Sequence, residues 1–91
     1  PSATSQSVLL VDDSAFFRNM LAPVLKAAGY KVRTAPNAQE GLAALRSGQG
    51  FDVVLTDIEM PDMNGFEFAD VIRADHNLGQ MPIIALSAMV S

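Results

Sequence analysis

The sequence predicts a single α/β domain built on a doubly wound parallel sheet. Short apolar runs alternate with segments whose apolar residues recur at helical spacing, and the connections between them are short. Two of the runs, residues 8–11 and 53–56, end directly in aspartates. An apolar run of this length is typical of a strand that is buried on both faces. The aspartates are therefore expected where the parallel sheet opens to solvent, the edge at which such sheets bind ligands.

The first half of the chain predicts strand, helix, strand and helix. Ser14 is a suitable N-cap for a helix whose apolar pattern stops at Gly29. Residues 30–35 alternate in polarity, which indicates a half-exposed strand at an edge of the sheet. A second helix is expected from about Ala38 to Leu45, because its leucines recur at helical spacing before a flexible exit rich in Gly and Ser.

The second half adds a strand, a helix and a strand. The run that ends at Asp57 is the third strand, and a helix is expected from about Gly65 to Ala74 with Phe66 or Phe68 in the core. Residues 82–86 predict a fourth, buried strand that presents Ser87 beside Asp57. Right-handed crossovers then place the switch point of the sheet between the first and third strands.

Length and composition exclude several classes of protein. The 91 residues are enough for one domain, and no apolar stretch approaches the roughly 18 to 20 residues that span a bilayer. A net charge of -4 with six basic residues argues against nucleic acid or a membrane surface as a direct partner. Residues 1–7 indicate a polar tail or linker without the features of a signal peptide, so a cytoplasmic location is expected.

Asp12, Asp13 and Asp57 are the candidate site residues. If the two strands that carry them are neighbours, each close pair of carboxylates repels by about 4 kcal/mol at roughly 4 Å and an effective dielectric near 20. A chain without cysteine holds a metal through oxygen ligands, and such a cluster suits Mg²⁺ and phosphoryl chemistry. Taken alone, Asp12 could simply cap a helix and Asp13 could favour the helix dipole, but Asp57 in register favours the metal site.

Three motifs in register resemble the receiver domains of bacterial two-component signalling. They are Leu-Val-Asp-Asp-Ser at 10–14, Asp57 followed by Met60-Pro61 and Gly65, and Pro-Ile-Ile-Ala-Leu-Ser-Ala at 82–88. The resemblance covers residues 8–89 and implies a flavodoxin-like receiver fold with strand order 2-1-3-4. Residues 14–19 and 21–25 are also similar to the receiver at the C-terminus of hybrid chemotaxis histidine kinases of the CheA type. A histidine kinase as the parent chain, and chemotaxis as the process, follow from this finer resemblance.

The resemblance implies a role for each candidate residue. Asp57 would accept a phosphoryl group from a phosphohistidine on a kinase or phosphotransfer domain. Mg²⁺ would be held by the side chains of Asp13 and Asp57 and the backbone carbonyl of Glu59, with Asp12 acting through a water. Ser87 would donate its hydroxyl to a phosphoryl oxygen and move towards it, which is the conformational switch. The domain would phosphorylate and dephosphorylate itself without turning over an external substrate.

The sequence departs from the family pattern at its C-terminal side. A receiver carries a lysine at the end of a fifth strand, whereas Lys26 and Lys31 lie too early to supply it. The last helix, strand and helix are lacking, so we expect residues 8–91 to be a receiver domain truncated after its fourth strand. The edge left open could then support a homo-oligomer.

Three alternative functions remain open. A phosphohydrolase of the haloacid dehalogenase type also uses an aspartyl phosphate, but it places its acids as Asp-x-Asp after the first strand, whereas those here are adjacent. A nucleotide or flavin module would need a first turn rich in Gly, Ser or Thr to hold phosphate. A degenerate receiver that acts only by protein contact is disfavoured by the intact acids and favoured by the absent lysine.

Overall fold

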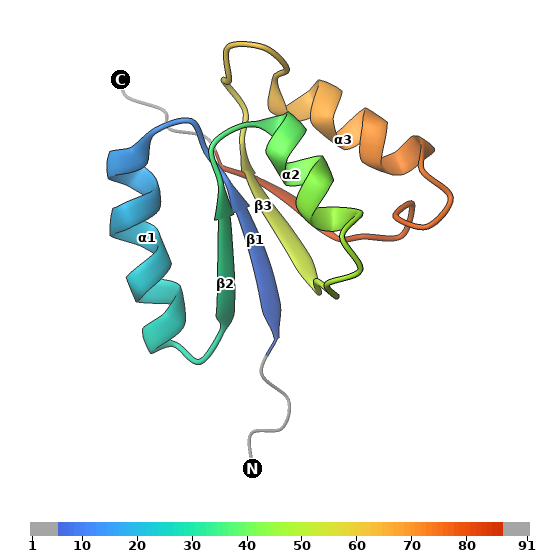
Figure 1. Cartoon of the computed structure of the whole chain (residues 1–91). Coiled ribbons are helices and arrows are strands. Elements are labelled where there is room, and N and C mark those ends of the chain that lie inside the picture. The colour runs from blue at the N-terminus through green and yellow to red at the C-terminus, as the bar shows by residue number, and fades with distance from the viewer. Residues whose placement is uncertain (1–5, 87–91) are drawn as a thin grey trace.

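A parallel four-stranded sheet with three helices forms the part of the chain that the structure describes, residues 6–86 of the computed structural model (Figure 1). The strand order is β2-β1-β3-β4, which confirms the predicted doubly wound topology. Within the described residues, no helix combines the length and apolarity needed to cross a membrane. The elements are β1 (Ser7–Val11), α1 (Ala15–Ala27), β2 (Lys31–Ala35), α2 (Ala38–Leu45), β3 (Val53–Asp57), α3 (Gly65–Ala74) and β4 (Ile83–Leu86).

Strand β1 lies at the centre and pairs with both β2 and β3. Its last residue, Val11, is in register with Ala35 of β2 and Thr56 of β3. The backbone N–H of Asp12 extends this ladder by donating to the carbonyl of Ala35 at 3.1 Å. All three pairings are parallel, so the carboxyl ends of the strands meet at one edge of the sheet.

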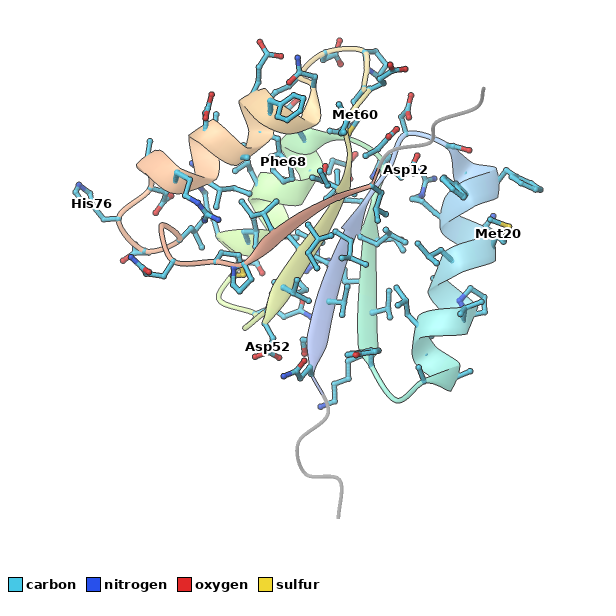
Figure 2. All side chains as sticks on the ribbon, turned by 180° about the vertical axis from the view of Figure 1, so that it is seen from behind. Asp12, Met20, Asp52, Met60, Phe68 and His76 are labelled. Atoms are coloured by element: carbon cyan, nitrogen blue, oxygen red, sulfur yellow. The ribbon has the colours of Figure 1, made fainter. Side chains whose placement is uncertain are left out.

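Helices α2 and α3 lie together on one face of the sheet and enclose the main core (Figure 1). Phe68 and Ile72 of α3 are fully buried there, as are the β-strand residues that point towards these helices. Figure 2 shows Phe68 between α3 and the strands. Leu42 and Leu45 of α2, whose helical spacing predicted that they face inward, are both buried. The buried members of this cluster are Leu9, Val11, Ala35, Ala38, Leu42, Ala44, Leu45, Val54, Met60, Phe68, Ile72 and Leu78.

Helix α1 is less deeply buried than the other two helices. Its predicted cap is present, since the Ser14 Oγ accepts from the Phe17 N–H at 3.2 Å, and the chain turns out of the helix at Gly29 with φ of 103°. None of its residues is buried, and exposed apolar side chains run along it at Phe16, Met20 and Val24. The apolar residues Phe17, Leu21 and Leu25 of this helix are half-buried, because the sheet covers the helix on one side only.

The prediction that β4 is a buried strand is wrong. Strand β4 is an edge strand that pairs only with β3 among the described strands, and its two middle residues are exposed while its two end residues are half-buried. Ile84 leaves 52% of its surface in solvent. Its apolar sequence predicted burial on both faces, but the side chains on the face that no described helix covers are exposed.

Phe66 and Phe68 provide a matched pair for testing this core, because they lie on the same helix and differ in burial. Phe68 has no exposed surface, whereas Phe66 is 64% exposed. We expect Phe68→Ala to lower the free energy of unfolding by about 3 to 5 kcal/mol, and Phe66→Ala to change it by less than about 0.5 kcal/mol. Urea denaturation followed by circular dichroism measures both, and equal losses in the two variants would contradict the described packing.

Candidate functional site

Three carboxylates converge at the carboxyl edge of the sheet. Oxygen atoms of Asp12, Asp13 and Asp57 all lie within 4.8 Å of one another. The first two follow β1 and the third ends β3, and these strands are paired side by side. The structure therefore brings together the acid doublet and the mid-chain aspartate from opposite halves of the chain.

Asp12 forms the buried floor of this cluster. Only 2% of its surface is exposed, and Figure 2 shows it at the end of the strands. Its Oδ1 accepts from the Ser14 N–H at 2.8 Å, which fixes the turn from β1 into α1. Asp12 therefore does not cap α1, because the N-cap is Ser14; one Asp12 oxygen makes a local turn bond while the cluster forms around the same side chain.

Asp13 and Asp57 form the accessible side of the cluster. Asp13 is exposed and Asp57 is half-buried, so a solute can reach both from solvent. The backbone of Asp57 is held from below, since the buried Thr56 donates its hydroxyl to the Asp57 carbonyl oxygen at 3.0 Å. A rigid backbone with an accessible carboxylate is what a reactive or ligating group requires.

Burial and neighbouring charges act together on the Asp12 carboxyl. Burial raises the pKa of the Asp12 carboxyl above its ordinary value, and the nearby charges of Asp57 and Asp13 raise it further. The N–H of Ser14 and the guanidinium of Arg18 oppose this rise. The buried carboxylate is thus destabilised in its charged form, and a cation bound beside it would relieve that cost.

Arg18 belongs to the site although the sequence analysis assigned it no role. Its Nη1 donates to the backbone carbonyl of Asp12 at 2.7 Å, from one turn beyond the Ser14 cap. The bond ties α1 to the loop that carries the acid doublet and brings positive charge towards the carboxylates. In the sequence, only its position four residues after Ser14 indicates this contact, because residues four apart share one helix face.

Two further candidates have different outcomes. Glu59 is exposed and follows Asp57 by two residues in the loop between β3 and α3, so its carbonyl lies on the chain segment that leaves the cluster. The role predicted for that carbonyl stays a prediction. Ser87 lies outside the described residues, which end one residue earlier at the C-terminus of β4.

The donor set fits a hard divalent cation. Ligand oxygens around Mg²⁺ at 2.0 to 2.1 Å from the metal are about 3 to 4 Å apart. Each of the three carboxylates here has an oxygen within 4.8 Å of the other two, so adjustments of the side chains would bring them to those separations. One carboxylate is buried, one is exposed and one is half-buried, which leaves room for water ligands on the solvent side. The chain contains no cysteine that could offer a competing soft ligand.

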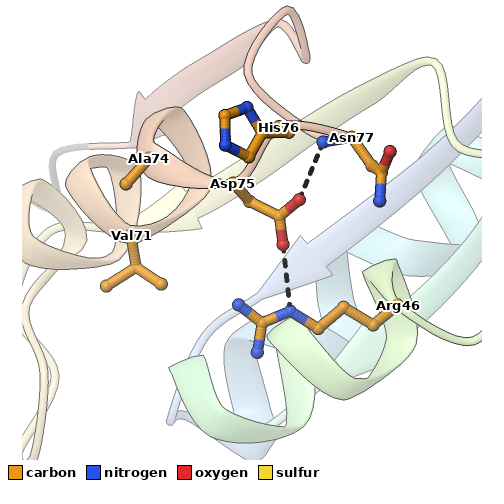
Figure 3. Close-up of a pocket in the computed structure, with 6 residues that line it drawn as sticks. All are labelled: Arg46, Val71, Ala74, Asp75, His76 and Asn77. Atoms are coloured by element: carbon orange, nitrogen blue, oxygen red, sulfur yellow. Dashed lines mark hydrogen bonds and ion pairs between the residues drawn. The ribbon is translucent and has the colours of Figure 1, made fainter.

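A separate pocket of about 480 Å³ lies where α2 and α3 end. Its main feature is an ion pair of 3.2 Å between Arg46 Nε and Asp75 Oδ2 (Figure 3). The Asn77 N–H lowers the pKa of the Asp75 carboxyl, and Arg46 adds to that effect. His76, the only histidine, is exposed here and lies far from Asp12 in Figure 2. This pocket brings no group to the acid cluster, and its ion pair has the character of a structural surface contact.

The strand order of the parallel sheet defines a flavodoxin-like α/β domain, and three aspartates form an acidic pocket at its switch point. The chain belongs to the response regulator receiver domain family, whose match covers residues 8–91. It is accordingly a CheY-like receiver domain of two-component signalling, the class that binds Mg²⁺ in an acidic pocket and interacts with histidine kinases or phosphotransfer partners.

Known proteins of this family resemble the chain over nearly all of its length. This chain is 36% identical over 91 residues to the sensor histidine kinase CheAY of Helicobacter pylori, and the match covers 99% of this chain and 11% of that protein. The chemotaxis protein CheY4 of Vibrio cholerae has 39% identity and a TM-score of 0.86, over 96% of this chain and 72% of that one. TrrA of Thermotoga maritima, in complex with Mg²⁺-BeF, has 38% identity and a TM-score of 0.83, over 92% and 70%. The chain thus spans about a tenth of its curated kinase relative.

Replacement of Asp12 by asparagine tests the electrostatics of the cluster. Because the folded-state pKa of Asp12 is raised, its stabilising contribution is complete below its unfolded value near 3.8 and is lost as the pH rises through the folded value. We therefore expect Asp12→Asn, which retains an acceptor for Ser14, to increase the free energy of unfolding at pH 7 without metal. The gain should shrink as the pH falls towards 4.

Urea denaturation in EDTA at pH 7 and pH 4.5 measures this effect, and Asp13→Asn is the matched control. Asp13 is exposed, so the loss of its charge relieves less desolvation and should change stability less. A loss of stability in Asp12→Asn that does not depend on pH would contradict the interpretation.

Proposed function

We propose that this receiver domain accepts a phosphoryl group on Asp57 from a phosphohistidine and relays a signal by a change of conformation. The observation that carries the proposal is the convergence of the Asp12, Asp13 and Asp57 oxygens within 4.8 Å at the open edge of the sheet. Asp57 is the candidate nucleophile because it is accessible, ends a central strand and has a fixed backbone.

In the proposed transfer, a carboxylate oxygen of Asp57 attacks the phosphorus of the donor phosphohistidine in line. An oxygen–phosphorus bond forms while the phosphorus–nitrogen bond breaks, and the electron pair of that bond leaves with the imidazole. The product on Asp57 is an acyl phosphate, which water later hydrolyses to restore the carboxylate. The exposure of Asp13 supports the access that a donor side chain needs from this side.

Asp13, Asp57 and the carbonyl of Glu59 would hold Mg²⁺, with Asp12 below them acting through a water. The metal would supply positive charge that offsets the negative charge of the carboxylates and the incoming phosphoryl group. Asp12 contributes a buried negative charge that retains the cation, and Arg18 and the Ser14 N–H keep its loop in place.

The output of the switch and the identity of its partners complete the proposal. Ser87 would hydrogen-bond a phosphoryl oxygen and move towards it, which shifts the segment after β4. The similarity to the CheAY protein supports a phosphohistidine kinase or phosphotransfer domain as the donor and chemotaxis as the process. A cytoplasmic location and a domain boundary near Val8 belong to the same proposal.

Asp57→Asn tests the identity of the phosphoacceptor. In the full-length protein we expect it to abolish labelling by a phosphohistidine donor or acetyl phosphate, because an amide oxygen is too weak a nucleophile. Borohydride trapping followed by mass spectrometry measures the site. Asp62→Asn is the control, since Asp62 is an exposed loop acid outside the cluster. Label on another residue, or label that persists in Asp57→Asn, would contradict the assignment.

Asp13→Asn tests the metal site. Loss of an accessible carboxylate ligand should weaken Mg²⁺ binding by about tenfold or more, and calorimetric titration measures the dissociation constant. The nearby Asp62→Asn variant has the same change in formal charge and should bind within about twofold of the unmodified protein, since surface charges outside a site contribute weakly. Equal weakening in both variants would show that only overall charge matters.

A further inference from the structure

Gly65, the first residue of α3, lies directly against the backbone that carries Asp57. Its N–H donates to the carbonyl oxygen of Ile58 at 2.7 Å. A Cβ atom built on Gly65 would lie 2.5 Å from the carbonyl oxygen of Asp57 and 2.9 Å from the Cα of Ile58. Both distances are too short for a real side chain, and the obstacles are backbone atoms that cannot rotate away.

The start of α3 is poorly able to move away from this contact. Asn64 caps the helix through a capping box, in which its side chain accepts from the Glu67 N–H at 2.8 Å and Glu67 accepts from the Asn64 N–H at 3.0 Å. One turn later, Phe68 is fully buried in the core. An atom added at Gly65 would therefore press against the peptide between Asp57 and Ile58.

That peptide sets the position of two parts of the proposed site. The Asp57 carboxylate projects from its first residue, and the Glu59 carbonyl follows one residue after Ile58. The Asp57 carbonyl that faces Gly65 is the same atom that accepts the Thr56 hydroxyl, so the peptide is held from both sides. A shift here would move the nucleophile and a metal-ligand carbonyl together.

We propose that Gly65 is a positioning residue, whose lack of a side chain lets α3 press against the Asp57–Ile58 peptide and hold the carboxylate in its reactive place. The inference rests on the proposed role of Asp57 as phosphoacceptor. The reason for a glycine here is steric and not conformational. Among the described residues, the glycines with positive φ are Gly29 and Gly48, so Gly65 has a backbone conformation that other residues can adopt.

The test compares three glycine-to-alanine variants in the full-length protein. Gly65→Ala introduces the clash with backbone. Gly41→Ala is the matched control for stability, because its Cβ would lie 3.0 Å from the Phe68 Cζ and Val11 Cγ2 atoms, which are side-chain atoms of the core and not backbone of the Asp57–Ile58 peptide. Gly50→Ala is the neutral control, since its Cβ would meet nothing within 4 Å. For each variant we would measure the urea midpoint, the Mg²⁺ dissociation constant and the rate of labelling by acetyl phosphate.

We expect Gly65→Ala to lower the labelling rate at saturating Mg²⁺, or the Mg²⁺ affinity, by about tenfold or more, because misplacement of a reacting group is strongly felt. Gly41→Ala should lower the urea midpoint while its labelling rate and Mg²⁺ affinity stay within about twofold. Wild-type values of both quantities in Gly65→Ala, or equal losses in Gly41→Ala, would overturn the inference. An unlabelled wild-type protein would instead overturn the proposed function.

If Gly65→Ala does not fold, the two helix caps provide a milder comparison. Asn64 and Asn37 each accept from the N–H of a glutamate three residues later at 2.8 Å, so alanine at either position should lower the urea midpoint by a similar amount. Only Asn64 fixes the turn that holds Gly65. Asn64→Ala should therefore slow labelling more than Asn37→Ala does, and equal rates in the two variants would overturn the inference.

Discussion

Burial of a carboxylate beside two other carboxylates at the carboxyl edge of the sheet is the constraint on which the rest of this structure depends. Asp12 is almost fully buried and has two other aspartates within 4.8 Å. Such an arrangement opposes folding unless the fold supplies compensation. The compensation is local, with one N–H from Ser14 and the guanidinium of Arg18, and it is incomplete because the pKa of Asp12 stays raised. The domain therefore retains a site that favours a cation.

The topology of the sheet is what creates that constraint. Strands β1 and β3 are adjacent although a helix, a strand and another helix separate them in sequence, and their parallel pairing sends both chain segments out at the same edge. The core beneath is apolar and continuous, from Leu9 in the sheet to Phe68 in α3. Stability accumulated in this core allows the edge to carry unfavourable charge, the usual relation between a scaffold and a functional site.

The sequence was sufficient for the topology because its signals were repeated and mutually consistent. Apolar runs, the cap at Ser14 and the short connections all favour the same alternating fold, and the acids could be placed from the strand ends alone. The edge position of β4 agrees with the implied strand order, but the exposure of its side chains could not be predicted, because an apolar run does not reveal which face of a strand a helix covers. The contacts of Arg18 and Gly65 could not be predicted either, because they depend on backbone atoms that only the folded chain brings close.

The exposure of Asp13 has a consequence for the timing of events at this site. In the proposed site, a ligand group in contact with bulk water would let an ion enter and leave without any loop opening or helix displacement. Occupancy would then follow the free concentration of the ion in the surrounding fluid, with exchange governed by dehydration of the ion itself. Under the proposed function, such a domain would be loaded or unloaded according to its environment, and its readiness to respond would be set before any partner arrives.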